Sequence, residues 1–230
     1  MLDIGRIGIW TFQLELQPAA KAQELAAEIE ELGFGALWIP EALGREALTH
    51  SGLLLAGTKR IVVATGIANI WGRDPMAMAN GQRTLTEAYP DRFLLGLGVS
   101  HAPMVGMRGH GYDKPLSFMR SYLDQMDAAP FMAQAPASEP QRIIAALAPK
   151  MLKLAAERSR GSHPYFVPPE HTQVAREILG KGPLLAPEQA VVLETDADTA
   201  RAIGRAHMSI YLGLPNYVNN LKRLGFTDDD

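Results

Sequence analysis

The side chains best placed for chemistry follow two apolar runs, at the points where those runs give way to small residues. Ser100 and His101 come after the run 93–98, and Asn69 comes after the run 61–64. Short apolar runs rich in β-branched residues and bounded by glycine are typical of buried strands. In parallel α/β proteins, ligands bind at the carboxyl ends of the strands. We therefore expect an active site that contains these polar groups.

A predicted helix between the two runs makes them one parallel βαβ unit. Asp74 has the residue type of an N-cap, Pro75 fits the first helical position, and Pro90 ends the run. Parallel strands need such a crossover, and both of their carboxyl ends then lie at the same edge of the sheet. Asn69 and His101 are therefore expected to face the same ligand.

Two histidines and one glutamate are candidates for moving protons. His101 and His163 lie at or near the carboxyl ends of predicted strands, and imidazole titrates near neutral pH. A loop histidine is more often a solvated or hydrogen-bonded side chain, so position alone favours His101 over His163. Glu41 ends another predicted strand, where it is either an ion-pairing residue or a hydrogen-bond acceptor for a ligand. No histidine pair has zinc-ligand spacing, and the chain has no cysteine, so no metal site is predicted.

The segment 98–102, GVSHA, resembles a nucleophile elbow that follows a strand. An elbow requires a helix to begin at once, whereas Pro103 and the nearby Gly106 and Gly109 predict a loop. No Asp followed by His stands out downstream, so a serine hydrolase is disfavoured. The glycines of 96–98 are better explained as allowing a flat ring or a phosphate to approach the backbone closely.

Composition limits the remaining functions. The chain has 230 residues, 22 basic and 25 acidic side chains, and a formal charge of −3, so no basic surface for nucleic acid is expected. No apolar run approaches the roughly 20 residues that span a bilayer, and no signal-like segment follows Met1. We expect one domain, residues 1–230, in a cytoplasmic protein that binds a small molecule and neither nucleic acid nor membrane.

The order of predicted elements indicates a TIM (β/α)8 barrel. Seven strands, each followed by a helix, are expected at 6–12, 36–41, 61–65, 93–98, 142–147, 161–166 and within 184–194, most firmly at 190–193. A barrel of this kind has eight such units. An eighth βα unit is not found before Asp230, so we expect either truncation at the C-terminal end, closure on seven strands, or cover from another chain, and we favour truncation.

Several long segments resemble the luciferase-like superfamily of flavin- and deazaflavin-dependent oxidoreductases, and in particular its actinobacterial coenzyme F420-dependent members. The resemblance covers nearly the whole chain. It is carried above all by ELGFGALWIPE at 31–41, ATGIANIWGRDPMAMA at 64–79, RTLTEAYPDRFLLGLGVSHAP at 83–103 and PKMLKLAAERSRGSHPYF at 149–166.

The resemblance implies a barrel with the ring of the cofactor in its mouth. Relatives carry a non-prolyl cis peptide at the end of strand 3 against the ring, which here would be Gly66-Ile67. Asn69 would then face the polar edge of the ring. Backbone N–H groups for the phosphate tail are expected at Gly98, Ser100, Gly161 and Ser162. Substrate contacts are expected from Trp10, Trp71 and His163.

The implied activity is hydride transfer between C5 of F420 and a small organic substrate, with His101 as the proton-transferring residue and Glu41 as a further candidate. Sugar-phosphate dehydrogenase relatives carry a Glu where this chain has His101, and an Asp-His pair where it has Glu41-Ala42, which argues against sugar oxidation. Two alternatives remain open: an FMN-dependent monooxygenase of the same fold, and a non-catalytic or degenerate cofactor-binding barrel. A homodimer is expected from the resemblance.

Overall fold

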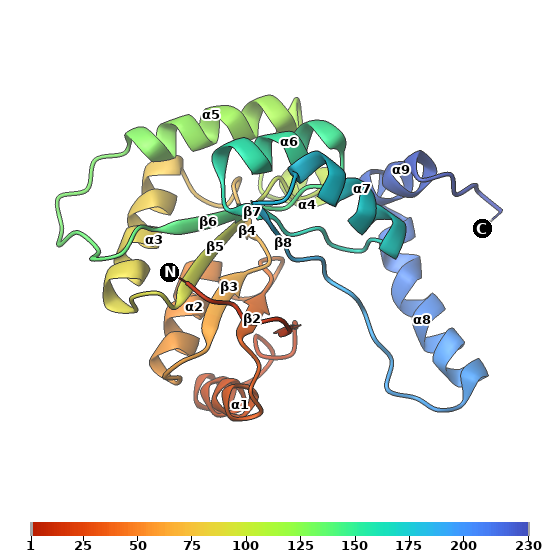
Figure 1. The fold of residues 1–230 in the computed structure, drawn as a ribbon, viewed down its shortest axis with the longest axis horizontal. Helices are drawn as coiled ribbons and strands as arrows, with labels where there is room; N and C mark the ends of the chain where they lie inside the picture. The colour runs from red at the N-terminus through yellow and green to blue at the C-terminus, as the bar shows by residue number, and fades with distance from the viewer. Residues whose placement is uncertain (1, 230) are drawn as a thin grey trace.

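A computed structural model describes residues 2–229, and its strands form one curled parallel sheet (Figure 1). The strand order is β1-β2-β3-β5-β6-β7-β8, with β4 paired to β5 beyond the end of β3. The strands are β1 Gly8–Trp10, β2 Ala36–Ile39, β3 Val62–Thr65, β4 Ala68–Asn69, β5 Phe93–Gly98, β6 Gln141–Ile144, β7 Gly161–Ser162 and β8 Leu184–Leu185. No pairing joins β1 to β8 within residues 2–229, so the expected TIM-type α/β architecture appears as an open barrel with seven sheet positions.

Helices α1 to α7 lie between successive strands and mostly cover the convex side of the sheet, while α8 and α9 follow the last strand. They are α1 Ala19–Glu31, α2 Ala47–Ala56, α3 Pro75–Ala88, α4 Ala102–Met107, α5 Pro115–Ala128, α6 Pro149–Arg158, α7 Pro169–Leu179, α8 Ala197–Leu212 and α9 Pro215–Arg223. The predicted start of α3 is confirmed, because the Asp74 carboxylate accepts a hydrogen bond of 2.9 Å from the Ala77 N–H and Pro75 is the first helical residue.

Alternation along the strands divides the core into two layers. Val63 and Leu95 belong to the larger cluster between sheet and helices, while Val62, Ala64 and Leu94 belong to a smaller cluster on the concave side. All of these side chains are buried, as expected for parallel strands covered on both faces. This smaller cluster fills the inside of the curled sheet, below the mouth of the barrel.

Two expectations about local structure were wrong. The strand placed most firmly at 190–193 is instead β8, Leu184–Leu185, which pairs with Gly161 and Ser162, whereas 190–193 has no regular structure. The apolar run at 190–193 misled the assignment: Val191 is 86% exposed and Leu193 fully exposed. The loop expected after His101 instead begins with α4, since Pro103 is compatible with the first turn of a helix.

The C-terminal helices leave the body of the sheet. An extended segment, 186–196, leads from β8 to α8, which in Figure 1 hangs apart from the helices on the convex side. Helix α9 then returns to the mouth, where Tyr217 and Asn220 are buried. The mouth is therefore bordered by segments from both ends of the sequence.

Candidate active site in the open barrel

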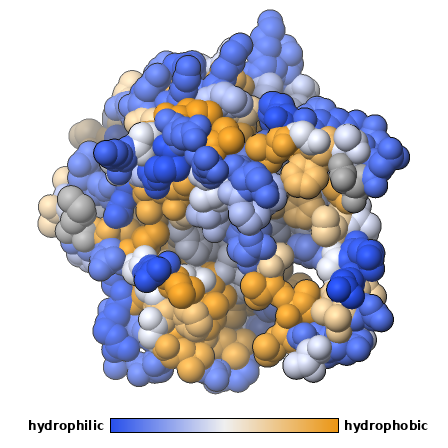
Figure 2. Space-filling model, turned by 45° about the vertical axis from the view of Figure 1, so that its right-hand side comes forward, coloured by the Kyte–Doolittle hydropathy of each residue, from blue (hydrophilic) through white to orange (hydrophobic). Residues whose placement is uncertain are grey.

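A cavity of about 1720 Å³ lies between β1, β8 and α8. It opens on the hollowed face shown in Figure 2, where hydrophobic side chains gather around the hollow. Trp10, Trp38, His163, Tyr165 and Glu188 are among its lining residues. Ligand pockets commonly have volumes of roughly 300–1,000 Å³, so this cavity has room for a cofactor together with a second molecule.

The cavity reaches the end of β3 through Trp10 and His163. The Gly66-Ile67 peptide is cis, as expected, and the Trp10 indole N–H donates a hydrogen bond of 2.9 Å to the Gly66 carbonyl. A Cβ atom at Gly66 would lie 2.6 Å from Trp10 Nε1 and 3.0 Å from His163 Nε2. Only glycine fits at this point between the two rings.

His163 is a buried, neutral imidazole with one nitrogen unused. Its Nδ1 lies 2.7 Å from the Ala186 carbonyl, which can only accept, so Nδ1 carries the proton. Burial lowers the pKa of His163 to about 4, against a weaker opposing effect of that hydrogen bond. Nε2 is therefore a free acceptor, and both it and the neighbouring Ser162 Oγ are buried without a hydrogen-bond partner. Buried polar atoms of this kind normally have partners, so Nε2 of His163, which lines the cavity, suits a polar ligand; Ser162 does not line it.

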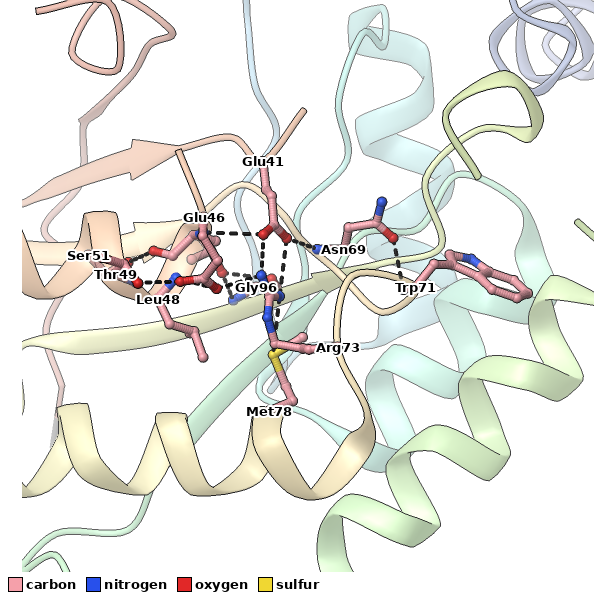
Figure 3. Close-up of polar contacts among 12 residues, drawn as sticks. Glu41, Glu46, Leu48, Thr49, Ser51, Asn69, Trp71, Arg73, Met78 and Gly96 are labelled. Carbon is pink, nitrogen blue, oxygen red and sulfur yellow. Dashed lines mark hydrogen bonds and ion pairs between the residues drawn. The ribbon is translucent and has the colours of Figure 1, made fainter. Parts of the chain in front are cut away.

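Glu41 is fully engaged with its own protein. Its carboxylate accepts from the Asn69 N–H at 2.6 Å, from the Ala47 N–H at 3.2 Å and from both terminal nitrogens of Arg73 (Figure 3). The side chains of Glu41 and Arg73 are only 5% and 11% exposed. Arg73 also pairs with Glu46, which caps α2. The structure thus gives Glu41 the contacts of a residue that fixes the backbone after β3.

The side chains of Asn69 and Trp71, in the segment after β3, make different contacts. Asn69 is buried, and its Oδ1 accepts a hydrogen bond of 2.9 Å from the Trp71 N–H. In Figure 3 the Trp71 ring points away from Glu41; it stacks on Phe118 of α5, with centroids 4.0 Å apart, and donates to the Val99 carbonyl. Trp10 and His163 line the cavity, whereas Trp71 is not among its lining residues.

The two glycines and two serines expected to contact phosphate lie close to their strand ends. Gly98 allows close packing of the bulge after β3, since a Cβ there would lie 2.6 Å from Ile67 Cδ1. Gly161 has φ +149° against β8, a conformation that L side chains rarely adopt. Ser100 has φ +57° and precedes α4, which gives the strand–serine–helix shape of a nucleophile elbow. No hydrogen bond between the Ser100 hydroxyl and a histidine or acid is found within residues 2–229, so that shape lacks its catalytic partners.

His101 lies on the other side of an aromatic cluster from the cavity. Tyr217 contacts His101 with ring centroids 5.2 Å apart and Tyr165, in the cavity wall, at 6.2 Å. His101 Nδ1 lies 2.9 Å from Asn216 Oδ1, and the Tyr217 hydroxyl lies 3.5 Å from Nε2. Burial lowers the pKa of His101, and the hydrogen bond to Asn216 acts in the opposite direction. The ring is therefore neutral at pH 7.

Sequence reasoning missed four residues of this region. They are Arg73, Glu188, Asn216 and Tyr217. Glu188 lines the cavity, and its burial raises the pKa of its carboxyl group. The only sequence signal for Arg73 was a polar residue in a loop beside a strand end. Asn216 and Tyr217 lie on a helix more than 110 residues from His101, so no local pattern connects them to it.

Within residues 2–229 no group of three or more acidic or histidine side chains is arranged to hold a metal, and no helix combines the length and hydropathy needed to cross a bilayer.

Residues 5–227 match the model of the family described as luciferase-like monooxygenase. The chain belongs to this family. Over 120 residues it is 33% identical to a Mycobacterium tuberculosis protein whose name is that of a coenzyme F420-dependent oxidoreductase, covering 52% of this chain and 33% of that protein. It is 27% identical to a 5,10-methylenetetrahydromethanopterin reductase of Archaeoglobus fulgidus, covering 95% of this chain and 74% of the reductase. The match thus spans only about a third of the mycobacterial relative.

The fold likewise has solved counterparts. The coenzyme F420-dependent tetrahydromethanopterin reductase of Methanopyrus kandleri matches with a TM-score of 0.68 at 18% identity, over 84% of this chain and 68% of the reductase. At that identity the likeness concerns the fold, and it supports the TIM-barrel-like architecture described above.

Proposed function

We propose that the chain is an F420-dependent oxidoreductase that transfers hydride between the deazaflavin C5 and a small organic substrate. The observation that carries the proposal is the cavity, which Trp10 and Trp38 line and where the buried Nε2 of His163, another lining residue, lacks a hydrogen-bond partner. The name of the Mycobacterium tuberculosis relative supports F420 as the cofactor. The substrate, a dimeric state and a cytoplasmic location stay predictions.

The residues present suit such a cofactor. When bound, F420 supplies the hydride acceptor or donor at C5. Trp10 and Trp38 offer flat apolar walls, while His163 offers an imidazole acceptor for a polar group of the ligand. Gly98 and Gly161 pack closely against Ile67 and the Leu184 backbone, respectively, and do not line the cavity. His101 would accept or return the proton that accompanies hydride transfer.

A second candidate is an FMN-dependent monooxygenase, since the description of the family names a monooxygenase. The two cofactors are distinguished by direct titration of the chain with F420 and, separately, with FMN. We expect F420 to bind about tenfold tighter or better, a difference of about 1.4 kcal/mol. Tighter binding of FMN would contradict the proposal, and binding of neither would favour a non-catalytic barrel.

A matched pair of variants ties the binding to the cavity. His163→Leu removes the free Nε2 acceptor and should weaken F420 binding. His171→Leu is the control, because His171 is equally buried but bonds the Leu147 carbonyl from α7 and does not line the cavity. Equal effects of the two substitutions on F420 affinity would place the cofactor elsewhere.

A further inference from the structure

We infer that Asn216 on α9 is a positioning residue that holds His101 in one tautomer, with the proton on Nδ1 and the lone pair on Nε2. This inference rests on the proposed function, in which His101 moves the proton, but its test needs no cofactor. His101 follows β5, whereas Asn216 lies 115 residues later in the chain. The contact is therefore made only when α9 packs on the mouth of the barrel.

The tautomer follows from the donors and acceptors of the two side chains. Asn216 Oδ1 lies 2.9 Å from His101 Nδ1, and an amide oxygen can only accept a hydrogen bond. Nδ1 must therefore carry the proton of the neutral ring, which leaves Nε2 unprotonated. Tyr217, the next residue on α9, places its hydroxyl 3.5 Å from Nε2, where it can only act as the donor. Two consecutive residues of α9 thus contact the two ring nitrogens and fix which of them carries the proton.

The partner of Nδ1 is neutral, and this matters for the direction of proton transfer. A carboxylate at this position would stabilise the imidazolium and raise the pKa of His101. Among the described residues no charged side chain contributes to the lowered pKa, which results from burial, opposed by the Asn216 bond. His101 is therefore a resting base with its lone pair at Nε2.

An unprotonated Nε2 suits a substrate that gives up a proton when it is oxidised. A carbon bearing an ionisable O–H or N–H group can give its hydride to the oxidised deazaflavin and its proton to Nε2. The C–H and O–H or N–H bonds break, a C=O or C=N bond forms, the substrate is oxidised by two electrons and F420 is reduced by two. The proton then leaves Nε2 for solvent while Nδ1–H stays bonded to Asn216.

The test is long-range ¹H–¹⁵N NMR of the six histidines in the complete chain without cofactor, with His101→Gln used to assign the His101 signals. We expect a protonated-type Nδ1 and an unprotonated-type Nε2 at neutral pH. Asn216→Ala should abolish this single tautomer. Asn216→Asp keeps the acceptor, and should retain the tautomer while raising the titration midpoint of His101 by about one to three pH units.

Asn219→Asp is the control, because it introduces the same charge at an exposed position of the same helix. It should leave the tautomer unchanged and move the midpoint much less. A proton on Nε2 in the native chain, an unchanged tautomer in Asn216→Ala, or equal midpoint shifts in the two aspartate variants would each overturn the inference. Because no cofactor is present, a failure to bind F420 would refute the proposed function without affecting this result.

Discussion

Replacement of His101 by alanine is expected to lower the rate of F420 reduction by about 10²- to 10⁴-fold, the usual contribution of a positioned acid or base. In the proposed function this partly buried imidazole, whose pKa burial lowers, is the proton acceptor. The rate should be measured from the cofactor's absorbance with the most active compound of a panel of small alcohols and amines. The affinity for F420, measured in parallel, should stay close to the native value.

The control for this substitution is His110→Ala. His110 is exposed and follows α4, nine residues after His101. Its ring lies near that of Trp71, with centroids 5.8 Å apart. Its removal should leave the rate nearly unchanged. If His101→Ala kept most of the native rate, or if both alanine variants lost activity equally, His101 would not be the proton-transferring group.

The native enzyme should also lose activity in acid. Burial lowers the pKa of His101 below its ordinary value of 6.5, so Nε2 stays unprotonated at neutral pH. The rate of substrate oxidation should therefore be constant around pH 7 and fall only at pH values under 6.5, as the ring takes up a proton.

Replacement of Glu41 by alanine is expected to lower the free energy of unfolding by about 3–5 kcal/mol, the cost of breaking a buried ion pair by removing one partner. Of its two carboxylate partners Arg73 would keep only Glu46, whose side chain is 44% exposed. The N–H groups of Asn69 and Ala47 would lose their acceptor. Urea unfolding of the native chain and the variant measures this difference.

Glu31→Ala provides the comparison for Glu41→Ala. Glu31 pairs with Arg60 at 3.0 Å, but their side chains are 71% and 63% exposed. Surface pairs of this kind contribute about 0–1 kcal/mol, so this variant should unfold at nearly the native urea concentration. Equal losses in the two variants would show that Glu41 does not hold the backbone after β3 more firmly than a surface pair does.

Much of the architecture could be predicted from local sequence. Apolar runs ending in small residues located the strands, and the Asp74-Pro75 pair gave the start of α3. Gly33 has φ +89° directly after the Leu32 C-cap, as expected for a helix end. These features depend on neighbours in the chain, and so the sequence pattern contains them.

The failures concern contacts between distant segments. The apolar run at 190–193 resembles a strand, but the residues that pair with β7 are Leu184 and Leu185. The residues around His101 include Asn216 and Tyr217, and the partner of Glu41 is Arg73. None of these pairs follows a helical or strand period, because each forms only once the sheet has curled.

The most direct test of the central claim follows the three tryptophan indole N–H signals by ¹H–¹⁵N NMR as F420 is added. Trp10 and Trp38 line the cavity, while Trp71 bonds the Val99 carbonyl and stacks on Phe118. A ring that binds beside Gly66 should shift the Trp10 and Trp38 signals and leave that of Trp71 nearly in place. Saturating F420 that moved none of the three, or Trp71 alone, would contradict the account.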